Sequence, residues 1–265
     1  MPYKVLPDSR IIHANRVLIN GAPNTGKTHS FRTWPHSKDS MLFILLYPGE
    51  GGGASVPQDE GIKTFTFEEE PGKKVSSAVS VREVKQLTIE ILSGKYGPCG
   101  TFAGDGLHKF ADLVLDDVTG GAYLLGEDFK PNLYKAAYNI FLNYIKMVNI
   151  SPVPRVVMTS WEGREAERPK KPGEPSATNI PTHIYPEMPG KLAKWIMGEF
   201  PIVVNSQTKQ VFKGGKIVTQ FAWQLQADDE VRGCGVKGPA EITSKLPKYC
   251  AQDWRVLEGL LEGEA

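Results

Sequence analysis

The chain has 265 residues, of which 40% are hydrophobic and 23% charged, and its formal net charge is +1. This composition is typical of a globular protein, and the length allows one sizeable α/β domain. The near-neutral charge excludes a protein that is basic throughout, so a nucleic-acid contact would need a local patch. The 3 cysteines and 5 histidines are scattered, without the spacing of a disulfide framework or a zinc site. We find no signal-peptide pattern and no membrane-spanning apolar run, and therefore expect a cytoplasmic protein without a membrane partner.

The first strong signal follows a lead-in, residues 1–16, and a short predicted strand, Arg16–Asn20. It reads Gly21-Ala22-Pro23-Asn24-Thr25-Gly26-Lys27-Thr28 and fits the phosphate-loop pattern G-x-x-x-x-G-K-[ST] at every specified position. Backbone amides of such a loop, and of the helix expected over Thr28–Trp34, point at phosphate oxygens. Lys27 would neutralise phosphate charge, and the Thr28 hydroxyl would bind Mg²⁺. The eight loop residues and the adjoining His29 are the candidate nucleotide-binding residues.

The next segment predicts a strand that is buried on both faces. The apolar run Met41–Tyr47 lacks polar alternation, and the loop Pro48–Gly53 brings Glu50 to its carboxyl end. A shorter strand is predicted over Lys63–Phe67. Apolar residues at helical spacing predict a helix over Val81–Leu92.

A second acidic site is predicted further along the chain. The run Phe110–Asp117 is apolar and ends in two aspartates, which favours a strand that delivers the magnesium ligand of a phosphate-loop protein. Asp116 is the first candidate because it directly follows the apolar run, and Asp117 is the alternative.

The remaining elements complete an α/β pattern. A helix is predicted over Pro131–Val148, and a buried strand, Arg155–Ser160, ends in the hydroxyls of Thr159 and Ser160. Residues 161–182 are rich in charge and proline and predict a mobile loop. We predict two further helices, over Pro189–Phe200 and Asp253–Leu261. Between them we predict three antiparallel strands, over Phe200–Asn205, Gln210–Lys213 and Lys216–Gln226, with a hairpin turn at Gly214-Gly215.

Alternating strands and helices predict a mostly parallel sheet with its ligands at the carboxyl ends of the strands. We therefore predict a single α/β domain over residues 1–265, with a core of about 10–226, a C-terminal extension, 227–265, and a C-terminal antiparallel hairpin. The resemblance described below implies that it is a RecA-like ATPase domain. The position of Glu50 favours the RecA-like branch of phosphate-loop proteins, where the catalytic Glu ends the strand after the phosphate-loop helix. In the AAA-plus branch that Glu directly follows the magnesium Asp, and here Asp117 occupies that place.

The whole chain resembles the RecA-core ATPases of tailed bacteriophages, a group with an AAA-type domain that includes minimal RecA-like single-strand-annealing recombinases. The resemblance covers about residues 10–250 and rests on Gly21–Thr28, Glu50–Gly52, Leu113–Asp116, Pro189–Lys191 and Gly235–Gly238. The chain departs from the group at Asp117, where Ser is more usual, and at Tyr47–Gly49, where an Asp often precedes the Glu.

The resemblance implies ATP and Mg²⁺ as cofactors and a role for each candidate residue. Lys27 would hold the triphosphate as a catalytic residue, Thr28 and Asp116 would hold Mg²⁺, and Glu50 would activate the attacking water. Thr159 or Ser160 would sense the γ-phosphate. A missing cation would come from a neighbouring subunit of a homo-oligomer, and its candidates, which are equally well explained as solvated surface charges, are Lys191, Arg232 and Lys237.

The resemblance also implies a partner. The segment 161–182 occupies the place of a DNA-contacting loop in RecA-like proteins, and its candidate contacts to single-stranded DNA are Trp161, Arg164, Arg168, Lys170 and Lys171. A flexible lid explains the segment equally well, because glutamates nearly balance its positive charge.

Three functions therefore compete at this point. The first is an ATP-dependent phage protein of DNA recombination and annealing, which acts in the bacterial host cytoplasm and has a single-strand-binding protein as a further candidate partner. The second is a nucleotide switch or AAA-type scaffold that recruits a protein partner. A small-molecule kinase is third and is disfavoured, because no Arg-rich lid for an acceptor phosphate is evident.

Overall fold

The computed structural model describes residues 15–50, 55–67, 80–166, 182–189, 191–227, 231–238 and 240–262. Its centre is a sheet with the strand order β11-β8-β7-β1-β5-β4-β2-β3. From β7 to β3 each neighbouring pair is parallel, whereas β8 and β11 run antiparallel to their neighbours. The strands of this path are β1 (Arg16–Gly21), β2 (Met41–Leu46), β3 (Ile62–Phe65), β4 (Cys99–Asp105), β5 (Arg155–Ala166), β7 (Ile202–Lys213), β8 (Lys216–Gln224) and β11 (Tyr249–Ala251).

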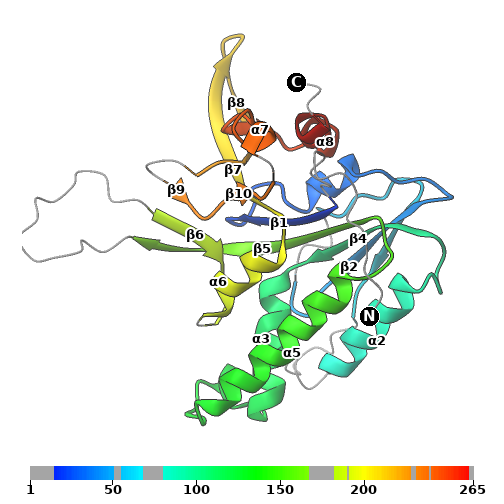
Figure 1. The fold of residues 1–265 in the computed structure, drawn as a ribbon, viewed down its shortest axis with the longest axis vertical. Helices are drawn as coiled ribbons and strands as arrows, with labels where there is room; N and C mark the ends of the chain where they lie inside the picture. The colour runs from blue at the N-terminus through cyan, green and yellow to red at the C-terminus, as the bar shows by residue number, and fades with distance from the viewer. Residues whose placement is uncertain are drawn as a thin grey trace, which may run out of the picture.

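Helices cover both faces of this sheet (Figure 1). One face packs against the long helices, which are α2 (Val81–Leu92), α3 (Leu107–Thr119) and α5 (Asn132–Asn149), and against the short α6 (Leu192–Ile196). The other face packs against the 3₁₀ helix η1 (His29–Thr33) and helix α8 (Trp254–Glu262). The parallel strands are apolar because both of their faces are buried in this way.

Short elements fill the connections between these layers. They are α4 (Ala122–Leu125), β6 (Thr182–Pro186), η3 (Met197–Glu199), β9 (Val231–Arg232), β10 (Gly235–Val236) and α7 (Ala240–Thr243). None of the helices in the described ranges is both long and apolar enough to cross a lipid bilayer.

The predicted fold class, a mostly parallel α/β sheet flanked by helices with a C-terminal antiparallel hairpin, is confirmed. Helix α2 has the predicted bounds because Ser80 and Glu83 form a capping box at its start. The hairpin turns at Gly214 and Gly215, which both have positive φ. The residues expected in an N-terminal arm lie, up to residue 14, outside the described ranges.

The strand predicted over Phe110–Asp117 is wrong, because these residues belong to helix α3. Short apolar runs do not distinguish a buried strand from a helix that is buried around most of its circumference. Helix α3 is such a helix: it packs on the sheet, on α5 and on α4, and its buried residues include Leu113, Val114, Leu115 and Asp116. Asp116 therefore does not lie at the carboxyl edge of the sheet.

Two further boundaries differ from the prediction. The predicted loop 161–182 begins and ends in strands, because β5 continues to Ala166 and pairs with β6 in an antiparallel ribbon; residues 167–181 lie outside the described ranges. The two strands predicted over Phe200–Asn205 and Gln210–Lys213 form one strand, β7, which pairs in parallel with β1 before it enters the antiparallel hairpin.

Candidate nucleotide site

The phosphate loop leaves β1 at the centre of the sheet, between β5 and β7. Gly21 is required there, because a Cβ atom would come within 2.7 Å of the Ser206 carbonyl oxygen and of the Thr25 hydroxyl. Gly26 has a φ of +85°, which favours glycine. The helix expected after the loop is only the short 3₁₀ helix η1. Only the backbone N–H groups of its single turn could therefore contribute to an anion site.

Lys27 is buried at the centre of this loop, with a relative exposure of 8%. Its ammonium group donates hydrogen bonds to the carbonyl oxygens of Gly21 and Ala22, both at 2.8 Å. Burial lowers the pKa of Lys27, and the negative charges of Asp105 and Glu50 oppose this effect. A buried cation that faces two carboxylates is suited to bind a charged group such as a triphosphate with its metal ion.

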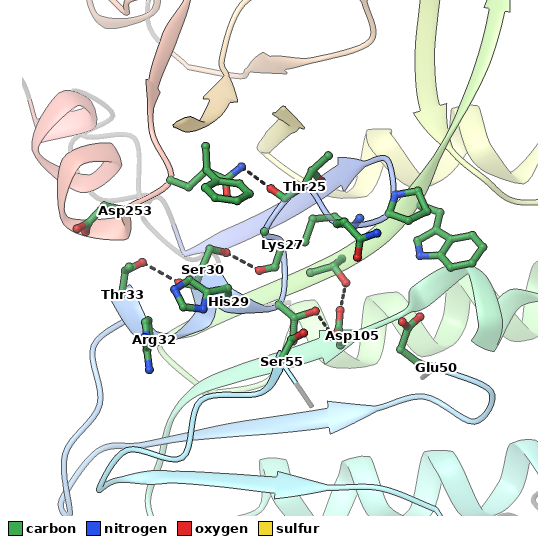
Figure 2. Close-up of a pocket in the computed structure, with 18 of the residues that line it drawn as sticks. Thr25, Lys27, His29, Ser30, Arg32, Thr33, Glu50, Ser55, Asp105 and Asp253 are labelled. Carbon is green, nitrogen blue, oxygen red and sulfur yellow. Dashed lines mark hydrogen bonds between the residues drawn. The ribbon is translucent and has the colours of Figure 1, made fainter. Parts of the chain in front are cut away.

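The acid that accompanies the phosphate loop is Asp105, at the carboxyl end of β4. The Thr28 hydroxyl donates a hydrogen bond of 2.7 Å to Asp105 Oδ2, and the Thr159 hydroxyl donates to Oδ1. Figure 2 shows Asp105 next to the loop that carries Lys27. Burial raises the pKa of Asp105, and the hydrogen bonds from Thr159 and Thr28 oppose this rise.

Asp105 replaces Asp116 as the candidate magnesium ligand. Asp116 is buried in α3, and its Oδ1 accepts a hydrogen bond from the backbone N–H of Leu124 at the start of α4. Its role there is to join two helices, and neither Asp116 nor the alternative, Asp117, is at the end of a strand. Oxygens of a Thr and an Asp side by side fit Mg²⁺, which is usually held by one or two carboxylates together with substrate phosphates and water.

Glu50 follows β2, as the sequence predicts, but the acid beside it is Asp105 and not Asp116. A turn brings Glu50 back over the edge of the sheet, and in this turn the Glu50 backbone N–H donates to the Tyr47 carbonyl. The Tyr47 backbone N–H donates in turn to the Asp105 carbonyl. The Glu50 side chain packs against Gly106, where a Cβ atom would be 2.4 Å from Glu50 Oε2. Burial raises the pKa of Glu50, and the nearby Asp105 raises it further. A raised pKa makes this carboxylate a better proton acceptor near neutral pH.

These groups line a cavity of about 910 Å³ above the phosphate loop. Its lining includes Glu50, Asp105 and Thr159, and also Arg32 and Phe221. The loop residues 23–28 and His29 also line it. Ser160 follows Thr159 on the opposite face of β5 and is buried.

The C-terminal part of the chain supports the phosphate loop from outside. The side-chain amide of Gln252 donates to the Thr25 carbonyl at 2.9 Å and to the Ser206 hydroxyl at 2.6 Å. The Ser206 hydroxyl donates to the same Thr25 carbonyl at 2.9 Å. Phe221 of β8 packs close to Gly26, where it leaves no room for a Cβ atom. Sequence patterns did not identify these residues, because they lie about 180 to 230 positions after the loop.

The predicted cation and DNA candidates are only partly described. Lys237 donates to the carbonyl oxygens of Met197 and Gly198, and Lys191 is exposed near Tyr138. Trp161 lines the cavity, stacks on His108 and lies under the Lys109 ammonium group. Arg164 and Arg232 have described backbones in β5 and β9, whereas Arg168, Lys170 and Lys171 lie outside the described ranges.

No protein-family model matches the chain, and no curated protein matches it. Among solved structures, the chain is similar to the crystal structure of flagellar accessory protein FlaH from Methanocaldococcus jannaschii. The identity is 10%, the match covers 80% of this chain and 79% of that chain, and the TM-score is 0.36. At this level of similarity, the functional argument depends on the geometry of the site.

Proposed function

We propose that this protein is a Mg²⁺-dependent ATPase with a RecA-like core. The observation that carries the proposal is the hydrogen bond between Thr28 of the phosphate loop and Asp105 at the end of β4. It brings the hydroxyl and the carboxylate that hold Mg²⁺ in phosphate-loop proteins to the same place. When bound, Mg²⁺ would neutralise charge on the phosphates of the nucleotide.

The residues of this chain divide the work as follows. Lys27 and the loop amides bind the β- and γ-phosphates, and the end of the cavity near Phe221 takes the nucleoside. Glu50 accepts a proton from the attacking water, for which its raised pKa suits it. Thr159 fixes the Asp105 carboxylate through its hydrogen bond.

The test compares ATP hydrolysis and ATP binding in three variants. Glu50→Gln should bind ATP with an affinity within about threefold of wild type but lose hydrolysis by about 10²-fold or more, because the amide accepts no proton. Lys27→Ala should lose ATP binding. Glu60→Gln is the control, because Glu60 pairs with Lys38 at the exposed surface. Hydrolysis by Glu50→Gln at the wild-type rate would contradict the assignment of Glu50.

The biological role that we infer is phage DNA recombination, with binding and annealing of single-stranded DNA. The resemblance of the sequence to phage RecA-core ATPases supports it, as does the ribbon of β5 and β6, which begins at the nucleotide site and carries Trp161 and Arg164. A nucleotide-dependent scaffold that recruits a protein through the same ribbon is the second candidate.

Binding of a fluorescent single-stranded oligonucleotide, with and without ATP, distinguishes these two roles. The recombination role predicts binding at moderate salt that weakens as salt rises, since basic residues would contact phosphates. Absence of binding in both conditions would exclude it and leave the scaffold.

The proposed homo-oligomer has support on the β7–β8 hairpin. Phe212 and Ile217 are cross-strand partners and are 77% and 69% exposed. They share a face of the hairpin with Phe221, which borders the nucleotide cavity. A second copy that docks on this face would sit next to the nucleotide.

Sedimentation velocity over a range of concentrations tests this assembly. Phe212→Ser combined with Ile217→Ser should shift the protein towards monomer. Lys213→Ser combined with Lys216→Ser is the matched control, because these residues are the adjacent cross-strand pair. Equal sedimentation of the two double variants would exclude this face as the interface.

A further inference from the structure

His108 faces Glu50 from the first turn of α3. Its Nε2 atom lies 3.8 Å from Glu50 Oε2. Both atoms are buried, and neither has a hydrogen-bond partner within the part of the chain that the structure describes. Buried polar atoms without a partner are costly, so two of them facing each other need an explanation.

The other side of the His108 ring determines which nitrogen carries the proton. The backbone N–H of Trp161 donates to His108 Nδ1 at 3.3 Å, so Nδ1 is an acceptor. Burial and the charges of Lys109 and Lys27 lower the pKa of His108 to about 3, so the ring is neutral. A neutral imidazole with an accepting Nδ1 carries its proton on Nε2, the nitrogen that faces Glu50.

The surroundings hold both side chains in this arrangement. The His108 ring stacks on Trp161, with ring centroids 4.7 Å apart and an interplanar angle of 25°. Glu50 is confined by Gly106, and the positive charges of Lys109 and Lys27 favour its ionised form. The sequence Asp105-Gly106-Leu107-His108 thus places the candidate metal ligand, the space for Glu50 and the His108 ring within one turn of chain.

We propose that His108 is a positioning residue, which donates its Nε2–H to the Glu50 carboxylate and holds it towards the attacking water. This inference rests on the proposed role of Glu50. The present separation is longer than a hydrogen bond, but catalytic hydrogen bonds are often long before substrate binds and shorten in the reactive complex. His108 lines the same cavity as Glu50 and faces the Glu50 carboxylate, so we assign it an effect on hydrolysis through Glu50.

The test uses two substitutions of His108. His108→Phe keeps a ring that can stack on Trp161 but removes both nitrogens, and His108→Gln keeps a donor. We expect His108→Phe to lower kcat by roughly 10-fold or more, in the range found for outer-shell partners of catalytic groups, with KM within about twofold. His108→Gln should recover part of this loss. Thermal unfolding and ATP binding report whether each variant is folded.

A double variant separates positioning from a structural effect. In the Glu50→Gln background, measured under single-turnover conditions, His108→Phe should change the rate by less than about twofold, because residues that act as a unit are not additive. An additive loss, or equal losses from His108→Phe and His108→Gln, would overturn the proposal. If His108→Phe hydrolyses ATP at the wild-type rate while Glu50→Gln is inactive, this inference is overturned and the proposed function stands. An inactive wild type would overturn the proposed function with it.

Discussion

Asp105 is the residue at which the separate parts of the site meet. It accepts hydrogen bonds from Thr28, which belongs to the phosphate loop, and from Thr159, which belongs to β5. It also raises the pKa of Glu50 through its charge. A single carboxylate therefore orders the candidate metal site and adds to the effect of burial on the pKa of Glu50, the group that would activate water.

Replacement of two aspartates distinguishes the sequence-based candidate from the structural one. Asp105→Asn should reduce Mg²⁺-dependent ATP hydrolysis by about 10²-fold or more, because it removes the charge next to the metal ion. Asp116→Asn should hydrolyse ATP at a rate within about threefold of wild type, because Asp116 accepts a hydrogen bond from α4 and does not line the cavity. Titration of the hydrolysis rate with Mg²⁺ makes the comparison. The reverse ranking of the two variants would restore Asp116 as the metal ligand.

The depressed pKa of His108 predicts a pH dependence of folding. Its pKa of about 3 lies below the ordinary value of 6.5 for histidine. The unfolded chain therefore binds a proton that the folded chain excludes, so the contribution of His108 to stability is complete above pH 6.5 and is lost as pH falls towards 3. The free energy of unfolding of wild type should decrease over this interval by up to about 1.4 kcal/mol per pH unit relative to His108→Phe. Chemical denaturation at several pH values measures the difference, and parallel curves would contradict a neutral His108.

Strand β4 shows where prediction from the sequence failed and why. Its sequence, Cys99–Asp105, contains few aliphatic residues, so periodicity does not identify it, and the apolar run that forms α3 predicts a strand instead. The reason is packing: a Cβ atom on Gly104 would come within 2.8 Å of the Tyr47 hydroxyl and of Met158 Sδ, and one on Gly100 would meet Ser40. The room for a side chain in a parallel sheet depends on the neighbouring strands, and a local sequence pattern carries no information about those strands.

Other elements were predicted well, because their signals are local. The phosphate loop, α2 with its capping box, α5 and the hairpin turn each depend on residues within a few positions of one another. Glu50 was placed correctly beside the loop for a similar reason, since it directly follows a strongly apolar strand. The contacts of the loop with Ser206, Phe221 and Gln252 come from the three-dimensional fold and were not predictable.

A bulkier side chain on β4 tests the packing argument. Gly104→Val should destabilise the fold by about 1–3 kcal/mol, since it forces Tyr47 and Met158 to move. It should also impair ATP hydrolysis, because Asp105 is the next residue. Gly259→Ala is the control, because the space around this glycine of α8 is open. If chemical denaturation gives Gly104→Val and Gly259→Ala the same free energy of unfolding, the packing explanation is contradicted.

At the scale of the whole molecule, the C-terminal segment closes the nucleotide site. Trp254 of α8 stacks on Trp34 with ring centroids 4.0 Å apart, and its backbone N–H donates to the hydroxyl of Thr33, the last residue of η1. Gln252 donates to the phosphate loop itself. The face of the sheet that carries the loop is thus covered by the two ends of the described chain together.

Loss of this support should weaken nucleotide binding without unfolding the protein. Gln252→Ala leaves the Thr25 carbonyl with one donor fewer, at a cost of about 1 kcal/mol, which corresponds to about fivefold weaker ATP binding. Gln210→Ala, on the exposed hairpin, should bind ATP as wild type does. Isothermal titration calorimetry measures both affinities, and equal values would show that Gln252 does not support the loop.

The 227 positions between Thr25 and Gln252 also have a consequence for biosynthesis. Because translation proceeds from the N-terminus, the ribosome completes the phosphate loop well before it adds Gln252. A nascent or prematurely terminated product that stops before Gln252 carries every residue of the loop motif and lacks the hydrogen bond that supports it. Tight nucleotide binding would then begin only once Gln252 has been added, which separates longer products from shorter ones.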